Sequence, residues 1–155
     1  GCNFISVMHT NMYGPNDNYD LNNSHVLPAL LRKFITAKNA GAPSVNMGGT
    51  GSAKREFLHA DDLAAACVYL MNTYDAEGLV NIGVGEDVYI LELAQLVQKI
   101  VGYNGTIATD PSKPDGTPRK LMDVSKLAAL GWKAQISLEE GIQRVYEEIK
   151  DKDWR

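Results

Sequence analysis

Short apolar segments alternate along this chain with amphipathic stretches, and this alternation limits the possible folds more than any other feature of the sequence. A short apolar run between turn residues predicts a strand, and apolar residues three and four apart predict a helix. We expect strands at 4–14 (buried), 42–48, 55–60, 78–85 and 106–110, and helices at 25–39, 61–74, 86–101, 123–131 and 137–150. Such alternation is typical of α/β proteins, so we predict that fold class.

The clearest helix begins at a histidine. Its apolar stripe consists of Val26, Leu27, Leu30, Leu31 and Phe34. We expect Ser24 to cap this helix and Pro28 to lie in its first turn, where no backbone N–H is needed. His25 then lies at the helix N-terminus, where the dipole favours a neutral imidazole that can exchange protons near neutral pH. A packed or capping imidazole is the alternative interpretation.

The composition argues against several classes of function. The formal net charge is −4, which does not suit a protein that binds nucleic acid or a membrane surface. No apolar run approaches the roughly 18 residues of a membrane-spanning helix. The two cysteines, Cys2 and Cys67, are too few for a disulfide framework and lack the spacing of a metal site. We therefore expect a cytoplasmic protein.

Two glycine-rich stretches resemble phosphate-binding loops only in part. Gly48, Gly49 and Gly51 precede a predicted strand, whereas a phosphate loop needs a helix directly after it, so we interpret them as a hairpin turn. Gly83 and Gly85 lie between a strand and a helix, but the third glycine of a dinucleotide fingerprint is missing. Neither stretch makes this chain a self-sufficient dinucleotide-binding domain.

Several cations could bind a polyanion. Arg55 opens a strand beside the first glycine turn, and a guanidinium is a preferred partner of phosphate oxygens. Lys113, Arg119 and Lys120 belong to the loop SKPDGTPRK, which its prolines and its Pro-Asp-Gly turn stiffen. A rigid cationic loop suits a diphosphate, although a solvated charged face is the alternative.

His59, Asp61 and Asp62 lie close together in the sequence. A metal site is one interpretation of this group. The strand pattern and the helix that follows favour a core imidazole with an aspartate as helix N-cap, so we predict no metal site here.

Four stretches of the chain resemble one enzyme family. TNMYGPNDNYDLNNSHVLPALLRKF, REFLHADDLAAA, NIGVGEDVYILELAQLV and SKPDGTPRKLMDVSKLAALGW are similar to the C-terminal half of GDP-L-fucose synthases. These are NADPH-dependent 3,5-epimerase/4-reductases of the extended short-chain dehydrogenase/reductase group, and they convert GDP-4-keto-6-deoxy-D-mannose to GDP-L-fucose. REFLHxDD alone indicates only the wider nucleotide-sugar group, whereas NSHVxPALLR together with KPDGTPRK is more specific.

The resemblance implies a fold and a division of labour. We expect residues 1–155 to be the substrate-binding domain, a small mixed sheet with flanking helices, in which 1–14 is the last strand of the cofactor domain. The NADP-binding Rossmann half would lie upstream, with its Tyr-x-x-x-Lys pair, catalytic serine and partner cysteine. By this interpretation the chain is a fragment and is inactive alone, and its parent is a homodimer through the missing half.

The resemblance also implies roles for single residues. His25 would be the acid that returns a proton during epimerisation. The residues expected to bind the substrate are Asn11, Lys33, Arg55 and Lys120, with Arg55 and Lys120 on the diphosphate. His9 and Met12 would line the nicotinamide side of the cofactor.

The chain departs from the family pattern at three of its positions. Lys33 stands where better-known members have arginine. The bidentate hydrogen bonds of a guanidinium are therefore replaced by the point charge of an ammonium group. Gly48 replaces an aromatic residue that packs on the substrate, and His9 replaces a proline. Two alternatives stay open: another nucleotide-sugar epimerase, dehydratase or reductase, and a non-catalytic nucleotide-sugar binding module.

Overall fold

The computed structural model describes residues 2–154. Gly1 and Arg155, the outer limits of the predicted substrate-binding domain, lie outside the described residues. The assignment of 1–155 to one functional domain, with 1–14 as a strand of another, stays a prediction.

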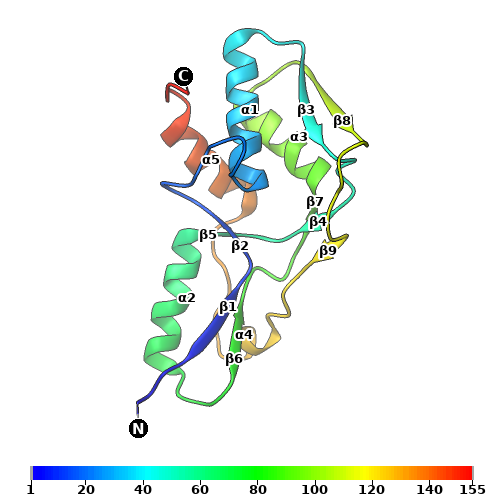
Figure 1. Cartoon of the computed structure of the whole chain (residues 1–155). Coiled ribbons are helices and arrows are strands. Elements are labelled where there is room, and N and C mark those ends of the chain that lie inside the picture. Colours follow the sequence, from blue (N-terminus) through cyan, green and yellow to red (C-terminus); the bar gives the residue numbers. More distant parts are fainter. Residues whose placement is uncertain (1, 155) are drawn as a thin grey trace.

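Strands and helices alternate along the chain as the sequence predicts (Figure 1). The strands are β1 Ser6–His9, β2 Asn11–Tyr13, β3 Ser44–Gly48, β4 Lys54–Arg55, β5 Phe57–His59, β6 Leu79–Ile82, β7 Val88–Tyr89, β8 Thr106–Asp110 and β9 Arg119–Lys120. The helices are α1 Val26–Ala40, α2 Ala60–Thr73, α3 Ile90–Val101, α4 Ser125–Ala129 and α5 Leu138–Ile149. The α/β fold class is confirmed.

The described strands pair in several small sheets rather than in one. Three of these are parallel pairs, β1 with β6, β2 with β5, and β3 with β8. In the remaining sheet, β4 pairs with β7 antiparallel and with β9 parallel. Parallel strands need a crossover connection, which is why the paired strands come from distant parts of the sequence. The predicted mixture of strand directions is therefore present, but divided among separate sheets.

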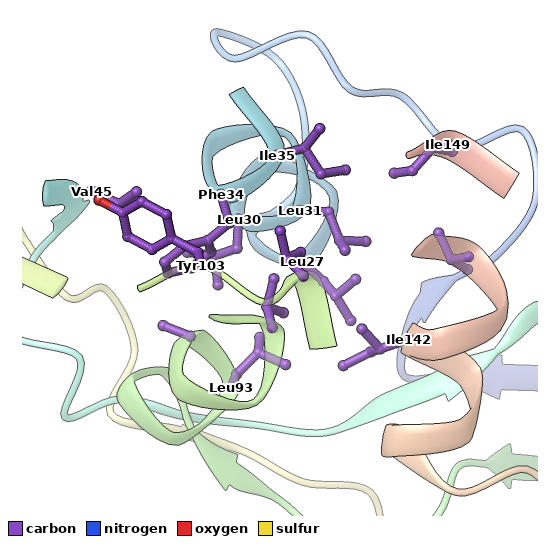
Figure 2. Packing of buried hydrophobic residues seen from close by; sticks show 14 of the residues in the cluster. Leu27, Leu30, Leu31, Phe34, Ile35, Val45, Leu93, Tyr103, Ile142 and Ile149 are labelled. Atoms are coloured by element: carbon purple, nitrogen blue, oxygen red, sulfur yellow. The ribbon is translucent and has the colours of Figure 1, made fainter. Parts of the chain in front are cut away.

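Buried apolar residues gather in two clusters. In the larger one, α1, α3 and α5 pack together, and the ring of Phe34 lies 5.6 Å from that of Tyr103 (Figure 2). The smaller one joins α2, β6 and α4 through Leu70, Val80 and Leu127. Figure 1 shows the β2–β5 and β4–β9 pairs between the two groups of helices. No helix described between residues 2 and 154 is long and apolar enough to cross a membrane.

The predicted N-caps of α1 and α2 are wrong. The N-cap of α1 is His25, and the hydroxyl of Ser24 is buried without a hydrogen-bond partner among the described residues. The N-cap of α2 is His59, whose Nδ1 accepts a hydrogen bond of 3.2 Å from the amide of Asp61. Since α2 begins directly after His59, Asp61 and Asp62 lie inside its first turn, where their charge still favours the helix dipole. The core imidazole is confirmed, with His59 only 2% exposed.

The predicted buried strand 4–14 is instead two short strands. A break at Thr10 separates β1 from β2, and β1 is largely exposed. Among the described residues β1 pairs with β6 alone, so one of its edges has no neighbouring strand. Its apolar sequence therefore predicts the strand correctly and its burial incorrectly.

The predicted hairpin at the first glycine turn is also wrong. The strand before the turn, β3, pairs with β8, and the strand after it, β4, pairs with β7 and β9. Gly49 and Gly51 have φ values of 81° and 78°, which L-residues rarely adopt, so the glycines are needed for the turn itself. Asp115 in the distant SKPDGTPRK loop accepts hydrogen bonds from the amides of Thr50 and Gly51. A contact of long sequence separation thus replaces the expected local pairing.

Candidate functional site

A cavity of about 870 Å³ lies where β1 and β2 end and α1 begins. Its lining includes most of the residues that the sequence singled out: His9, Asn11, Met12, His25 and Lys120. They come from separate parts of the chain, since His9 ends β1, Asn11 and Met12 belong to β2, His25 precedes α1 and Lys120 ends β9. Arg55 and Lys33 do not line this cavity. The structure brings these five residues together, and their roles stay predictions.

His25 lines the cavity from the start of α1. Its backbone is extended, with φ −68° and ψ 165°, and its carbonyl accepts the amide of Ala29 at 3.1 Å. Its side chain makes no capping hydrogen bond and is exposed. The His25 side chain therefore does not stabilise the helix N-terminus through a hydrogen bond, and it is accessible to a ligand.

Asn11 and Thr10 are fixed by the backbone of a neighbouring segment. The Asn11 side-chain amide donates to the carbonyl oxygen of Glu56 at 2.9 Å, and the Thr10 hydroxyl donates to the same oxygen at 3.4 Å. The Asn11 amide group is thereby oriented, with its nitrogen turned to Glu56. A carboxamide held in this way can offer its oxygen as an acceptor to a ligand.

His9 and Met12 both line the cavity and are both exposed. Nδ1 of His9 lies 2.7 Å from the carbonyl oxygen of Thr10. Because a carbonyl only accepts, Nδ1 carries the hydrogen in this contact. Met12 is 39% exposed, which leaves an apolar side chain open for a flat ring to lie against.

Arg55 and Lys120 lie opposite each other on the paired strands β4 and β9. Nη1 of Arg55 donates to the carbonyl oxygen of Lys54 at 2.7 Å, and a Cβ at Gly116 would lie 3.5 Å from Nη2. The guanidinium therefore lies against the Pro-Asp-Gly turn of the loop that ends in Lys120. The pairing places a guanidinium-bearing and an ammonium-bearing residue side by side on neighbouring strands, and Lys120 of this pair lines the cavity. Two neighbouring cations suit a diphosphate.

The other cations of the loop have different surroundings. Arg119 forms an ion pair with Asp87, and this hydrogen bond holds the pKa of Asp87 below its ordinary value. Lys54 lies 4.0 Å from the same carboxylate. Arg119 lines the cavity but its charge is already paired, so Lys120 is the better candidate for an anionic ligand.

Lys33 lies in a second cavity, of about 1050 Å³. Its Nζ donates to the carbonyl oxygen of Asn46 at 3.2 Å, and Gly48 and Lys113 line the same cavity. Lys33 follows His25 by eight residues, which corresponds to about 12 Å along the axis of α1. The structure therefore separates Lys33 and Lys113 from the group around His25.

The glycine turns do not offer their amides to a phosphate. The amides of Val84 and Gly85 donate to Oε1 of Glu56 at 2.5 and 2.7 Å. The amides of Thr50 and Gly51 donate to Asp115 at 2.7 and 3.2 Å. Both sets of donors that a phosphate-binding turn would need are therefore occupied by carboxylates.

Neither Glu56 nor Asp115 was expected from the sequence to have a functional role. A signal for Glu56 was present, because it is an acidic residue inside the apolar segment REFLH, and a buried carboxylate needs partners. No comparable signal exists for Asp115, whose place in a Pro-Asp-Gly turn is typical of an exposed loop.

Comparisons with known proteins agree on one family. The sequence profile of the NAD dependent epimerase/dehydratase family matches residues 1–83. GDP-L-fucose synthase 1 of Arabidopsis thaliana is 56% identical over 147 residues, which are 95% of this chain and 46% of that protein.

Two solved structures are also similar. A GDP-6-OMe-4-keto-L-xylo-heptose reductase from C. jejuni has a TM-score of 0.89 at 37% identity, with 97% of this chain and 55% of the other covered. A GDP-L-fucose synthetase from Naegleria fowleri bound to NADP has a TM-score of 0.89 at 28% identity, with coverages of 98% and 49%. The chain spans about half the length of these proteins.

Proposed function

The chain belongs to the NAD-dependent epimerase/dehydratase family, and from this premise we propose that it forms the substrate-binding part of a GDP-L-fucose synthase-like enzyme. The reaction is the epimerisation of GDP-4-keto-6-deoxy-D-mannose at C3 and C5, followed by reduction at C4. The observation that carries the proposal is the cavity that gathers His9, Asn11, Met12, His25 and Lys120 from three distant parts of the chain. The identity to plant GDP-L-fucose synthase over nearly the whole chain supports it.

His25 is the proposed acid of the epimerisation. The C4 ketone acidifies the protons at C3 and C5, so a base can remove one of them and leave an enolate. An acid then returns a proton to the opposite face of that carbon, which inverts its configuration. An imidazole suits this step because it gains and loses protons near neutral pH, and the exposed ring of His25 is not held by a capping bond.

Arg55 and Lys120 are the proposed partners of the diphosphate. Arg55 offers a planar guanidinium and Lys120 a compact ammonium, and the two lie on paired positions of β4 and β9. Lys33 is the proposed contact farther along the substrate, in the second cavity on α1. Asn11, oriented by the Glu56 carbonyl, is the proposed contact to the sugar beside the nicotinamide.

The cofactor of the proposed reaction is NADPH, which supplies the hydride that reduces C4. His9 and Met12 are exposed residues that line the cavity, and we propose them as contacts of the nicotinamide end. The amides of both glycine turns are engaged by Glu56 and Asp115, so these turns do not fit the phosphates of a dinucleotide. We propose that an upstream half of the parent protein binds most of the cofactor and forms a homodimer, and that the parent is cytoplasmic.

The substrate proposal is tested by the nucleotide that the chain binds. Isothermal titration calorimetry of the 155-residue chain with GDP, UDP and dTDP should show the tightest binding for GDP. Equal affinity for the three nucleotides would favour another nucleotide-sugar enzyme of the family. Absence of binding by all three would contradict the proposal.

The catalytic proposal is tested in the protein made from the complete reading frame that encodes this chain. With GDP-4-keto-6-deoxy-D-mannose in D₂O, the wild type should incorporate deuterium at C3 and C5, and His25→Ala should lose incorporation at one or both carbons. Asn22→Ala, in the exposed loop before the helix, is the matched control and should behave as the wild type. Normal incorporation by His25→Ala would assign His25 to the helix start alone.

A second candidate function is the reduction of another GDP-sugar without epimerisation. The similarity to the C. jejuni GDP-heptose reductase, at a TM-score of 0.89, favours it. The same D₂O experiment separates the two candidates, because a simple C4 reductase does not exchange the protons at C3 and C5.

A further inference from the structure

Glu56 is a fully buried acidic residue between β4 and β5, with 0% exposure. Its carboxylate accepts hydrogen bonds from three backbone amides. Oε1 accepts from Val84 at 2.5 Å and Gly85 at 2.7 Å, and Oε2 accepts from Met122 at 2.9 Å. Both carboxylate oxygens therefore act as acceptors, which balances the cost of removing the charge from water.

One of these hydrogen bonds and the backbone carbonyl of Glu56 reach two different segments that line the candidate site. Met122 lines the cavity together with Lys120 and Leu121. The backbone carbonyl of Glu56 holds the side chain of Asn11, which lines the cavity from the side of β2. The carboxylate of Glu56 thus holds the cavity wall that contains Met122, and its backbone carbonyl holds the wall that contains Asn11.

We infer that Glu56 is a positioning residue of the substrate site, which holds the Lys120–Met122 wall against the strand that carries Asn11. This inference rests on the proposed function, because it takes the cavity to be the site of a GDP-sugar. Glu56 itself contacts no cavity directly, since it is buried and absent from the lining of both cavities. It acts on the ligand through the position of Lys120.

The hydrogen-bond pattern explains why a carboxylate is required here. In Glu56→Gln the amide oxygen can take the place of Oε1 and keep the two bonds from Val84 and Gly85. The amide nitrogen then faces the N–H of Met122, and two donors oppose each other. The substitution therefore releases the Met122 wall selectively and leaves the 84–85 turn in place.

The chain offers a matched control in Asp62. This carboxylate is also buried and accepts backbone amides, from Gln135 at 3.0 Å and from Ile136 at 2.9 Å. Neither Gln135 nor Ile136 lines either cavity. Asp62→Asn thus disturbs a comparable network whose amide donors do not line the proposed site.

The test compares GDP binding and amide hydrogen exchange for the wild type, Glu56→Gln and Asp62→Asn of the 155-residue chain. We expect Glu56→Gln to bind GDP about tenfold more weakly and Asp62→Asn to bind it as the wild type does. In Glu56→Gln the amide of Met122 should exchange faster while the amides of Val84 and Gly85 stay protected. A purely structural role predicts equal loss of protection at all three amides and similar affinities in the two variants.

The outcomes separate the inference from the proposed function. If the wild type does not bind GDP, the proposed function fails and the inference falls with it. If the wild type binds GDP and Glu56→Gln binds it equally well, only the inference is overturned. Should Glu56→Gln fail to fold, Gly83→Ala is the second variant for the binding test. A Cβ at position 83 would overlap Oε1 of Glu56, so it would displace the carboxylate without replacing it by an amide. Unchanged GDP affinity of a folded Gly83→Ala would also overturn the inference.

Discussion

His25 illustrates how the backbone and the side chain of one residue can have separate tasks. Its carbonyl accepts the first hydrogen bond of α1, from Ala29, while its side chain makes no capping bond in a residue that lines the cavity. Removing the ring therefore leaves the backbone cap intact. A loss of proton exchange in His25→Ala can then be assigned to the missing imidazole rather than to an unfolded helix start.

Asp115 is the residue that ties the cationic loop to the first glycine turn. It accepts hydrogen bonds from the Thr50 hydroxyl and amide, both at 2.7 Å, and from the Gly51 amide at 3.2 Å. The hydrogen bond from the Thr50 hydroxyl is the main cause that lowers the pKa of Asp115 below its ordinary value of 3.8. The charged form is thus favoured in the folded chain.

The lowered pKa predicts how the contribution of Asp115 to stability depends on pH. A carboxyl whose pKa is lower in the folded state stabilises the fold above its unfolded pKa, and this contribution disappears as the pH falls through the folded pKa. We expect Asp115→Asn to lower the urea midpoint at pH 7, and the difference from the wild type to shrink as the pH falls below about 4.

Urea titrations at several pH values check this expectation. Asp75→Asn, a change at an exposed aspartate, is the control and should leave the midpoint unchanged at each pH. A difference between Asp115→Asn and the wild type that stays constant down to the lowest pH would contradict the prediction.

At the scale of elements, α1 combines the core of the larger cluster with two predicted site residues. Its apolar stripe packs against α3 and α5, and Leu27, Leu31 and Phe34 are almost wholly buried (Figure 2). His25 at its start faces one cavity and Lys33 faces the other. The packing of this stripe therefore fixes how the two cavities are placed along the helix.

We expect Phe34→Ala to destabilise the chain by about 3 kcal/mol or more, because it leaves a cavity beside Tyr103 that the neighbouring helices cannot fill. Chemical denaturation measures this free energy of unfolding. Thr36→Ala on the exposed side of the same helix is the control and should change it by less than about 0.5 kcal/mol. A loss below about 1 kcal/mol for Phe34→Ala would show that α1 is not held by the larger cluster.

At the scale of the whole molecule, the described residues form a cavity that gathers five predicted site residues, but neither of the two glycine turns singled out from the sequence is open to a dinucleotide. The amides of both glycine turns donate to carboxylates within the chain. The chain also spans about half the length of the relatives to which it is similar. These two observations support the proposal that binding of the sugar and most of the cofactor binding belong to different parts of the parent protein.

We therefore expect the 155-residue chain alone to bind GDP without oxidising NADPH. NADPH absorbance is followed with GDP-4-keto-6-deoxy-D-mannose, and the protein from the complete reading frame serves as the positive control. Stoichiometric oxidation of NADPH by the 155-residue chain would overturn the division of labour that we propose.

The sequence by itself determined the elements whose signals are local. The apolar stripe of Val26–Phe34 predicted α1, and the apolar run at 106–110 predicted β8 with its observed bounds. Hydrophobic periodicity depends only on residues close together in the sequence, so it can be recognised without knowing which segments pack against each other. The resemblance of the NSHVxPALLR and KPDGTPRK segments to one enzyme family was likewise contained in the residues themselves.

Only the tertiary structure decided the contacts between distant segments. It paired β3 with β8 instead of forming a hairpin, and it placed Asp115 on the first glycine turn. It also buried Glu56 under the amides of Val84, Gly85 and Met122, and it separated Lys33 from the cavity of His25. The physical reason is that hydrogen-bond partners far apart in sequence are chosen by packing and by the need to satisfy buried polar groups, and neither leaves a periodic pattern in the sequence.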